Sequence, residues 1–183
     1  MTAGSGNPGK GLLVRRLAAH DAPAYRALML EAYEQAADAF TSTAEERRAE
    51  PTGWWIARIG SSADQGESFG AFLAGELVGT VAIEYSSKPK TRHSALVIGM
   101  YVTASARRFG AARQLLQALV AAAAQRPGVE LLRLTVTEGN APAIRLYESM
   151  GFAAWGVEPL AIRTPGGLRG KVHMMRRLGA PIS

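Results

Sequence analysis

The sequence predicts a mixed α/β fold in which one sheet carries helices on both faces. Two apolar runs, residues 94–102 and 131–136, each lead into a helical apolar pattern, which is typical of parallel strands joined by a crossover helix. Two further runs, 68–73 and 77–85, flank the turn residues Ala74-Gly75-Glu76 and indicate an antiparallel hairpin. We therefore expect a mixed, mostly antiparallel sheet with one parallel pair inside it.

The N-terminal part is predicted to contain one strand and two helices. Residues 12–17 are apolar and basic in a pattern typical of a strand. Asp21 is placed to cap a helix that has Pro23 in its first turn. The segment Thr43-Ala44-Glu45-Glu46 resembles a capping box at the start of a second, more polar helix. The apolar residues that follow are suited to packing and are Trp54, Trp55, Ile56 and Ile59.

The C-terminal part continues the alternation of strands and helices. The long helix after residues 94–102 is expected to end near Arg126-Pro127-Gly128, because proline blocks its continuation. Four elements follow in order: a strand over 131–136, a helix over 141–150, and a final pair of strands over 152–162 and 171–178. The turn residues between the last two strands are Thr164-Pro165-Gly166-Gly167.

Length and composition are those of an ordinary globular chain. The 183 residues suit one domain, expected over residues 12–180, after a polar and disordered tail over 1–11. No apolar run reaches the length that spans a membrane. The chain has no cysteine, which excludes disulfides, thiolate metal sites and a cysteine nucleophile. No metal site is predicted, and the lack of cysteine is compatible with a cytoplasmic protein.

The chain is strongly basic, with a formal net charge of +6 and a pI near 10.1. Such a charge suits an anionic ligand, a nucleic acid or a membrane surface. Its arginine pairs are scattered along the chain, and no basic stripe interleaved with aromatic residues appears. A nucleic-acid-binding module therefore remains a minor alternative that rests on charge alone.

The strand over 94–102 leads into a basic, glycine-containing turn at the start of a helix. Its pattern is R-x-x-G-x-A, read as Arg107, Gly110 and Ala112. The chain lacks both the G-x-x-x-x-G-K-[ST] loop and the G-x-G-x-x-G fingerprint, so two common nucleotide sites are excluded. The first backbone N–H groups of a helix lack intrahelical partners, and the helix dipole adds positive charge there. This turn is therefore a candidate pyrophosphate site.

A second motif follows the strand over 131–136. It reads N-x-x-A-x-x-L-Y-x-x-x-G-F, and its matching residues are Asn140, Ala143, Leu146, Tyr147, Gly151 and Phe152. The two motifs, in this order and at this separation, resemble the signatures of the GNAT superfamily of N-acetyltransferases. The resemblance covers nearly the whole chain, from Leu13 to about Leu178.

The resemblance implies a GNAT-like fold, in which the central parallel strands splay apart, and acetyl-coenzyme A (acetyl-CoA) as cosubstrate. Gly99 could mark the bulge that splays the strands or could merely relieve packing. Backbone groups of the fourth strand would hold the pantetheine arm, and the basic turn would hold the pyrophosphate. The implied coenzyme contacts are Met100, Tyr101, Val102, Arg107, Arg108, Phe109, Gly110, Ala111, Ala112 and Asn140.

The resemblance also implies transfer of the acetyl group to a primary amine by direct attack. Tyr147 would protonate the leaving thiolate, although its helical position also suits a core tyrosine. A backbone N–H near Gly99 or Met100 would stabilise the oxyanion. The fourth strand contains no acid, so Glu84 and His93 are the candidates for the general base, and each also suits a solvated surface.

The sequence does not identify the acetyl acceptor, which could be a small amine, an amino acid, an antibiotic or a protein amino group. In this family, the residues that select the acceptor lie mainly in the first helical region and the last hairpin. The aromatic and histidine residues there either line a pocket or fill the core, and they are Tyr33, Phe40, Trp54, Trp55 and His173. A catalytically inactive sensor of the same fold is an alternative, and a monomer and a homodimer are both compatible with the sequence.

Overall fold

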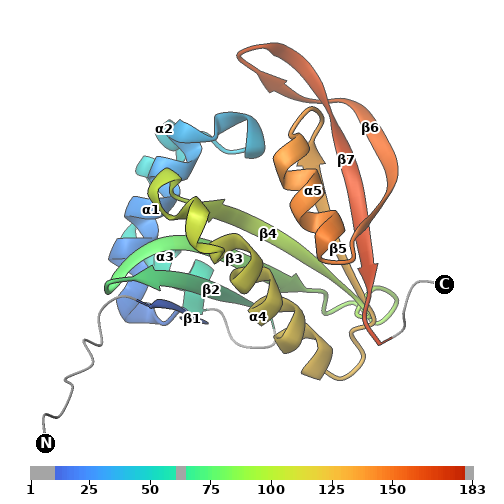
Figure 1. The fold of residues 1–183 in the computed structure, drawn as a ribbon, viewed down its shortest axis with the longest axis horizontal. Coiled ribbons are helices and arrows are strands. Elements are labelled where there is room, and N and C mark those ends of the chain that lie inside the picture. The colour runs from blue at the N-terminus through green and yellow to red at the C-terminus, as the bar shows by residue number, and fades with distance from the viewer. Residues whose placement is uncertain (1–10, 61–64, 180–183) are drawn as a thin grey trace, which may run out of the picture.

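The computed structural model describes residues 11–60 and 65–179, and it contains one mixed sheet (Figure 1). The described strands are β1 (Leu12–Arg16), β2 (Gly66–Leu73), β3 (Glu76–Tyr85), β4 (Ser94–Val102), β5 (Leu131–Thr137), β6 (Ala153–Thr164) and β7 (Gly167–Arg177). They lie in the order β1-β2-β3-β4-β5-β7-β6, and every neighbouring pair is antiparallel except β4 and β5. This confirms the predicted mixed sheet. The predicted tail over residues 1–11 lies outside the described residues apart from Gly11.

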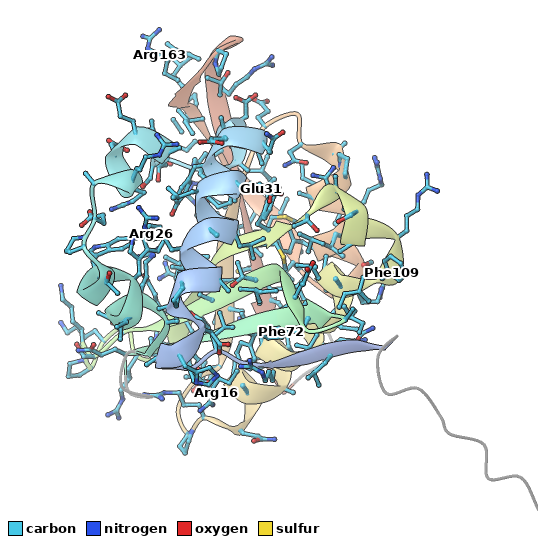
Figure 2. The ribbon with its side chains drawn as sticks, turned by 90° about the vertical axis from the view of Figure 1, so that its left-hand side faces the viewer. Arg16, Arg26, Glu31, Phe72, Phe109 and Arg163 are labelled. Atoms are coloured by element: carbon cyan, nitrogen blue, oxygen red, sulfur yellow. The ribbon has the colours of Figure 1, made fainter. Side chains whose placement is uncertain are left out.

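Helices cover both faces of the sheet, as predicted. They are α1 (Ala22–Gln35), α2 (Ala44–Arg48), α3 (Thr52–Gly60), α4 (Ala111–Gln125) and α5 (Ala141–Ser149). Buried residues of α1 and α3 form one core with Leu17, Phe72 and Tyr101. Buried residues of α4 and α5 form a larger core with β2 to β5 and β7. Figure 2 shows α1 crossing in front of the strands, so the two cores lie on opposite faces of the sheet.

The second predicted helix is in fact two helices, α2 and α3. Pro51 stands between them and disfavours helical backbone at Glu50 before it. The capping box is confirmed: the Thr43 N–H donates to Glu46 Oε2 at 2.7 Å, and the Glu46 N–H donates to Thr43 Oγ1 at 3.2 Å. Because α2 is short and has no buried residue, this cap is a main local source of its stability.

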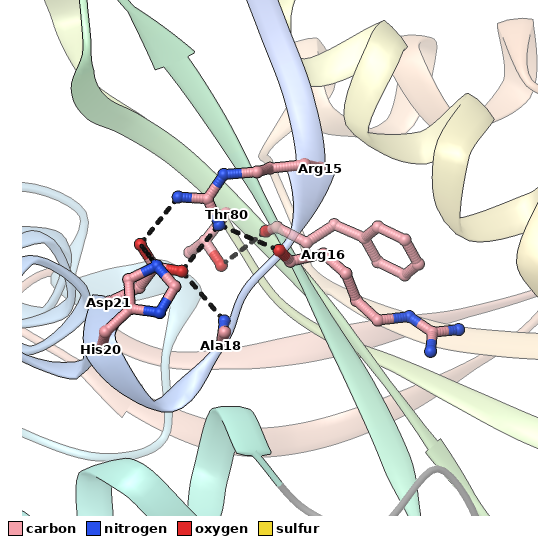
Figure 3. A network of polar contacts seen from close by, with 7 residues as sticks. Arg15, Arg16, Ala18, His20, Asp21 and Thr80 are labelled. Atoms are coloured by element: carbon pink, nitrogen blue, oxygen red, sulfur yellow. Dashed lines mark hydrogen bonds and ion pairs between the residues drawn. The ribbon is translucent and has the colours of Figure 1, made fainter.

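The prediction that the Asp21 side chain caps α1 is wrong in detail. Asp21 stands at the N-cap position, but its carboxylate accepts no hydrogen bond from the helix. It accepts instead from the Ala18 N–H at 2.9 Å and from two Arg15 nitrogens at 2.7 and 2.8 Å (Figure 3). A bidentate arginine is a stronger partner for the carboxylate than a helix N–H, so Asp21 binds Arg15 instead of capping α1.

The two predicted hairpins are present. Ala74 and Gly75 both have positive φ, 51° and 86°, which is the geometry of a two-residue type I′ turn between β2 and β3. In the last hairpin, β7 begins at Gly167 rather than at the predicted Lys171. Much of β6 and β7 is exposed there, so the residues before Lys171 lack the apolar alternation that identifies a strand in a sequence. In the described residues, no helix has the length and apolar character needed to span a membrane.

Candidate active site

A cleft opens where β4 and β5 diverge. The two parallel strands pair only over Ser94–Leu96 with Leu131–Arg133. Figure 1 shows them separating from this shared end. Beyond Leu96, the β5-facing backbone groups of β4 have no partner in β5, so they are available to a ligand that enters between the strands.

A bulge in β4 accompanies the divergence. Thr80 of β3 pairs with Tyr101 and Ala82 pairs with Ile98, so two residues of β4, Gly99 and Met100, stand opposite one of β3. Gly99 has φ +64°, a backbone conformation that residues with a Cβ rarely adopt. The alternative that Gly99 merely relieves packing is disfavoured, because a Cβ added there would meet nothing within 4 Å.

The cleft has a volume of about 350 Å³. Both strands line it, over residues 97–100 of β4 and 134–137 of β5. The other lining residues are Met29, Tyr33, Ala39, Phe40, Thr41, Ser42, Arg58, Glu84, Asn140, Ala143, Tyr147 and Lys171. The cleft therefore brings together residues from α1, α3, β3, α5, β7 and the segment after α1.

The basic turn leads from β4 to α4. A 3₁₀ segment over Ala104–Phe109 is followed by Gly110, which has φ +73° and precedes the first residue of α4. No side chain caps α4, so its first N–H groups have no side-chain partner. Arg107 and Arg108 are exposed, as is Phe109, which lies at the periphery in Figure 2. These features are those of a surface site for an anion.

Tyr147 and Asn140 reach the cleft from α5. Tyr147 is 7% exposed and packs edge-on against Phe152, with ring centroids 5.7 Å apart. Burial raises the pKa of Tyr147 well above its usual value, so its hydroxyl stays protonated. Among the described residues, this hydroxyl has no hydrogen-bond partner. Asn140 caps α5, and its side-chain oxygen accepts from the Ala143 N–H at 3.2 Å.

The two candidates for the general base lie at different places. Glu84 is exposed, lines the cleft and stands opposite Leu96 in the register of β3 and β4. His93 precedes β4, at the end where β4 and β5 still pair, and its carbonyl accepts from the Glu130 and Leu131 N–H groups. His93 is absent from the lining of the cleft. The structure thus brings Glu84, but not His93, to the point where the strands separate.

Of the candidate acceptor residues, some line the cleft and others do not. Tyr33 and Phe40 line the cleft and meet edge-on, with ring centroids 5.2 Å apart. Trp55 is 1% exposed and belongs to the core beneath α1 and α3. His173 lies outside the cleft, with its Nε2 3.2 Å from a Glu158 carboxylate oxygen.

Trp54 lines a second cavity of about 390 Å³ between α3 and the strands β2 and β3. We call it the side cavity. It shares four residues with the cleft, namely Arg58, Glu84, Ile98 and Gly99. The side cavity therefore adjoins the cleft at the bulge of β4.

Two cations that line the cleft, Arg58 and Lys171, are not among the residues predicted from the sequence. Arg58 stands four residues after Trp54 in α3 and so lies on the same side of that helix. Lys171 pairs with Thr137 in the register of β5 and β7, and burial lowers its pKa. The helical spacing could have placed Arg58 beside Trp54, but no local signal places either cation in the cleft.

A model of the acetyltransferase (GNAT) family matches residues 27–152. No match was found among curated proteins. A ribosomal-protein-alanine N-acetyltransferase from Brucella melitensis is 27% identical, with 91% of this chain and 99% of that chain covered and a TM-score of 0.74. A GCN5-related N-acetyltransferase from Kribbella flavida is 26% identical, with 92% and 98% covered and a TM-score of 0.77.

The same fold occurs in a structure that contains the cofactor. In yncA from Salmonella typhimurium, solved with its cofactor acetyl-CoA, the identity is 20%, the coverage is 95% of this chain and 98% of that chain, and the TM-score is 0.76. The family model spans more than half of the chain and includes the bulged strand, the basic turn and Tyr147. The chain therefore belongs to the GNAT family of acetyltransferases.

Proposed function

We propose that this protein is an N-acetyltransferase that moves an acetyl group from acetyl-CoA to a primary amine within a ternary complex. The family uses acetyl-CoA as its acetyl donor. The observation that carries the proposal is the cleft at the bulge of β4. It has a strand edge without a partner on one side, a buried tyrosine on another, and a carboxylate at its wall.

The coenzyme would lie along β4 and end at the basic turn. Backbone groups of Met100, Tyr101 and Val102 would bind the pantetheine arm, because β5 has left that edge of β4 unpaired. The uncapped start of α4 would bind the pyrophosphate, helped by Arg107 and Arg108. Asn140, at the start of α5, would add a further contact to the coenzyme.

The transfer needs two proton movements. Glu84 would accept a proton from the amine, directly or through water, as the amine nitrogen bonds to the acetyl carbon. A backbone N–H at the bulge, near Gly99 or Met100, would stabilise the oxyanion. The carbon–sulfur bond then breaks, and Tyr147 would give its proton to the departing thiolate. The protonated phenol of Tyr147 in the cleft supports this role.

An acceptor screen tests the proposal. Acetyl-CoA is incubated with amino acids, small amines, aminoglycosides and peptides with free N-termini, and free thiol is measured. We expect amine-dependent thiol release for at least one class. If acetyl-CoA binds but every amine leaves the thiol signal at background, the protein is not an acetyltransferase of amines, and the sensor alternative is favoured.

A further inference from the structure

The wall shared by the cleft and the side cavity holds one cation and one carboxylate. Of its four residues, Arg58 and Glu84 are charged, and Ile98 and Gly99 belong to β4 at the bulge. Arg58 and Glu84 form no ion pair with each other within 4.0 Å. A ligand at this wall therefore meets both signs of charge at separate places, next to the predicted point of acetyl transfer.

Arg58 is held in place, but no carboxylate of the described residues forms an ion pair with it. Its Cζ lies 5.2 Å from the ring centroid of Trp54, and its charge lowers the pKa of Tyr25 against the larger effect of burial. Its Nε is buried and has no hydrogen-bond partner among the described residues. That Nε is closed to solvent, but the residue is only partly buried and lines both cavities, so a ligand oxygen would reach the guanidinium through its terminal nitrogens.

The other acidic residue at the side cavity does not form an ion pair with Arg58. Glu67 lines that cavity, but its carboxylate is bound by Arg16 and accepts from the Tyr85 hydroxyl. Across the cleft, Lys171 adds a second cation, and no hydrogen bond or ion pair joins its amine to another described residue. The charged groups that line the cleft are thus two cations and one carboxylate, which suits a ligand with an anionic group.

We propose that the acetyl acceptor is an amine that also carries a carboxylate, as an amino acid does. The carboxylate would bind the two terminal nitrogens of Arg58, because this end of a guanidinium matches a carboxylate in geometry and charge. The amine would then face Glu84 at the bulge. This inference rests on the proposed function and names the acceptor class of the same site.

The test compares acceptors that differ only in the carboxylate. L-leucine is assayed against L-leucinamide, and L-phenylalanine against L-phenylalaninamide, by thiol release from acetyl-CoA. The amide has the same shape but no charge, and its amine is less basic, so more of it is neutral at pH 7.5 and intrinsic reactivity favours the amide. We expect the reverse, with kcat/KM for the amino acid higher by about 10- to 100-fold, the range of a charged hydrogen-bonded contact.

Arg58→Gln identifies the cation, with Arg163→Gln as the matched control at the far periphery of the last hairpin (Figure 2). Arg58→Gln should raise KM for the amino acid by a similar factor and leave KM for the amide and the affinity for acetyl-CoA unchanged. Arg163→Gln should change none of them. Equal effects of Arg58→Gln on both acceptors, or a preference of the unmodified protein for the amides, would overturn the inference.

A binding measurement separates this inference from the proposed function. With coenzyme A present, L-leucine or L-phenylalanine should raise the melting temperature of the unmodified protein, and the matching amide should not. If no amine is acetylated yet this difference is seen, the proposed function fails and the carboxylate site stands. If amides are acetylated and amino acids neither react nor bind, the proposed function stands and the carboxylate site is wrong.

Discussion

At the scale of single residues, Tyr147 carries a sharp prediction about mechanism. Tyr147 lines the cleft, and its hydroxyl has no hydrogen-bond partner among the described residues. Tyr147→Phe should therefore change the free energy of unfolding by less than about 1 kcal/mol, because no partner is left unsatisfied. Turnover should fall by about 10²-fold, the usual contribution of a positioned acid, with unchanged affinity for acetyl-CoA.

The pH dependence provides a second readout for Tyr147. Burial raises the pKa of its phenol, so the proton remains available well above pH 7. Any loss of turnover at alkaline pH that comes from ionisation of this group should disappear in Tyr147→Phe. Full turnover in a stably folded variant would remove Tyr147 from the mechanism. A large drop in melting temperature with normal turnover would assign it to packing.

Asp21 carries a prediction about stability. The bidentate contact of Arg15 with its carboxylate (Figure 3) lowers the pKa of Asp21 to about 2. The lowered pKa stabilises the fold above the usual aspartate pKa near 4, and this contribution is lost as pH falls towards 2. Arg15 is 37% exposed, so screening reduces the contribution to about 1–2 kcal/mol.

Urea unfolding of Asp21→Asn at several pH values checks this. The variant should be less stable than the unmodified protein by about 1–2 kcal/mol at pH 7, and the difference should shrink between pH 4 and pH 2. Glu45→Gln, an exposed position in the first turn of α2, should show no such change. A constant difference across the pH range would mean that the ion pair does not stabilise the fold.

At the scale of elements, the start of α4 is the proposed site of the coenzyme pyrophosphate. Gly110→Asp places a negative side chain where the backbone is expected to approach the pyrophosphate, so the Kd for acetyl-CoA should rise at least about tenfold. Gly128→Asp is the matched control, because Gly128 also has a positive φ and open space around a Cβ, beyond the opposite end of α4.

Both variants place a side chain in left-handed backbone, so both should lose about 1–2 kcal/mol of stability. Isothermal titration with acetyl-CoA separates the effects, because only Gly110→Asp should lose affinity. Arg107→Ala should weaken binding less, since exposed arginine–phosphate pairs are partly screened by salt. Equal affinity in Gly110→Asp and Gly128→Asp would mean that the phosphates lie elsewhere.

At the scale of the whole molecule, the proposed acetyl-CoA site bridges two parts of the sheet that have separated. The ligand would contact β4, α4 and α5 together, so it binds the folded state and not the unfolded chain. At a concentration 100 times its Kd, it should add about 2.7 kcal/mol and raise the melting temperature by about 5–10 °C. NAD and ATP should shift it much less. A similar shift with all three would indicate general anion binding by a basic protein.

The sequence by itself determined the elements and their order, except for the division of one predicted helix into α2 and α3. Helix starts depend on contacts within about four residues, as in the capping box of Thr43 and Glu46, so the chain alone reveals them. Strand pairs such as β2 and β3 follow from two short runs around a short turn, although the structure shortens the predicted turn by pairing Glu76 with Leu73. The motif at Arg107 to Ala112 and the helix that carries Tyr147 could be placed for the same reason.

Only the tertiary structure decided which side chains meet in the cleft. Glu84, Arg58 and Lys171 come from β3, α3 and β7, and their convergence depends on sheet order and on the divergence of β4 from β5. Trp54 and Trp55 are neighbours in sequence, yet one faces a cavity and the other the core, because successive helical residues point about 100° apart. Packing between distant elements sets such positions, and no local pattern encodes it.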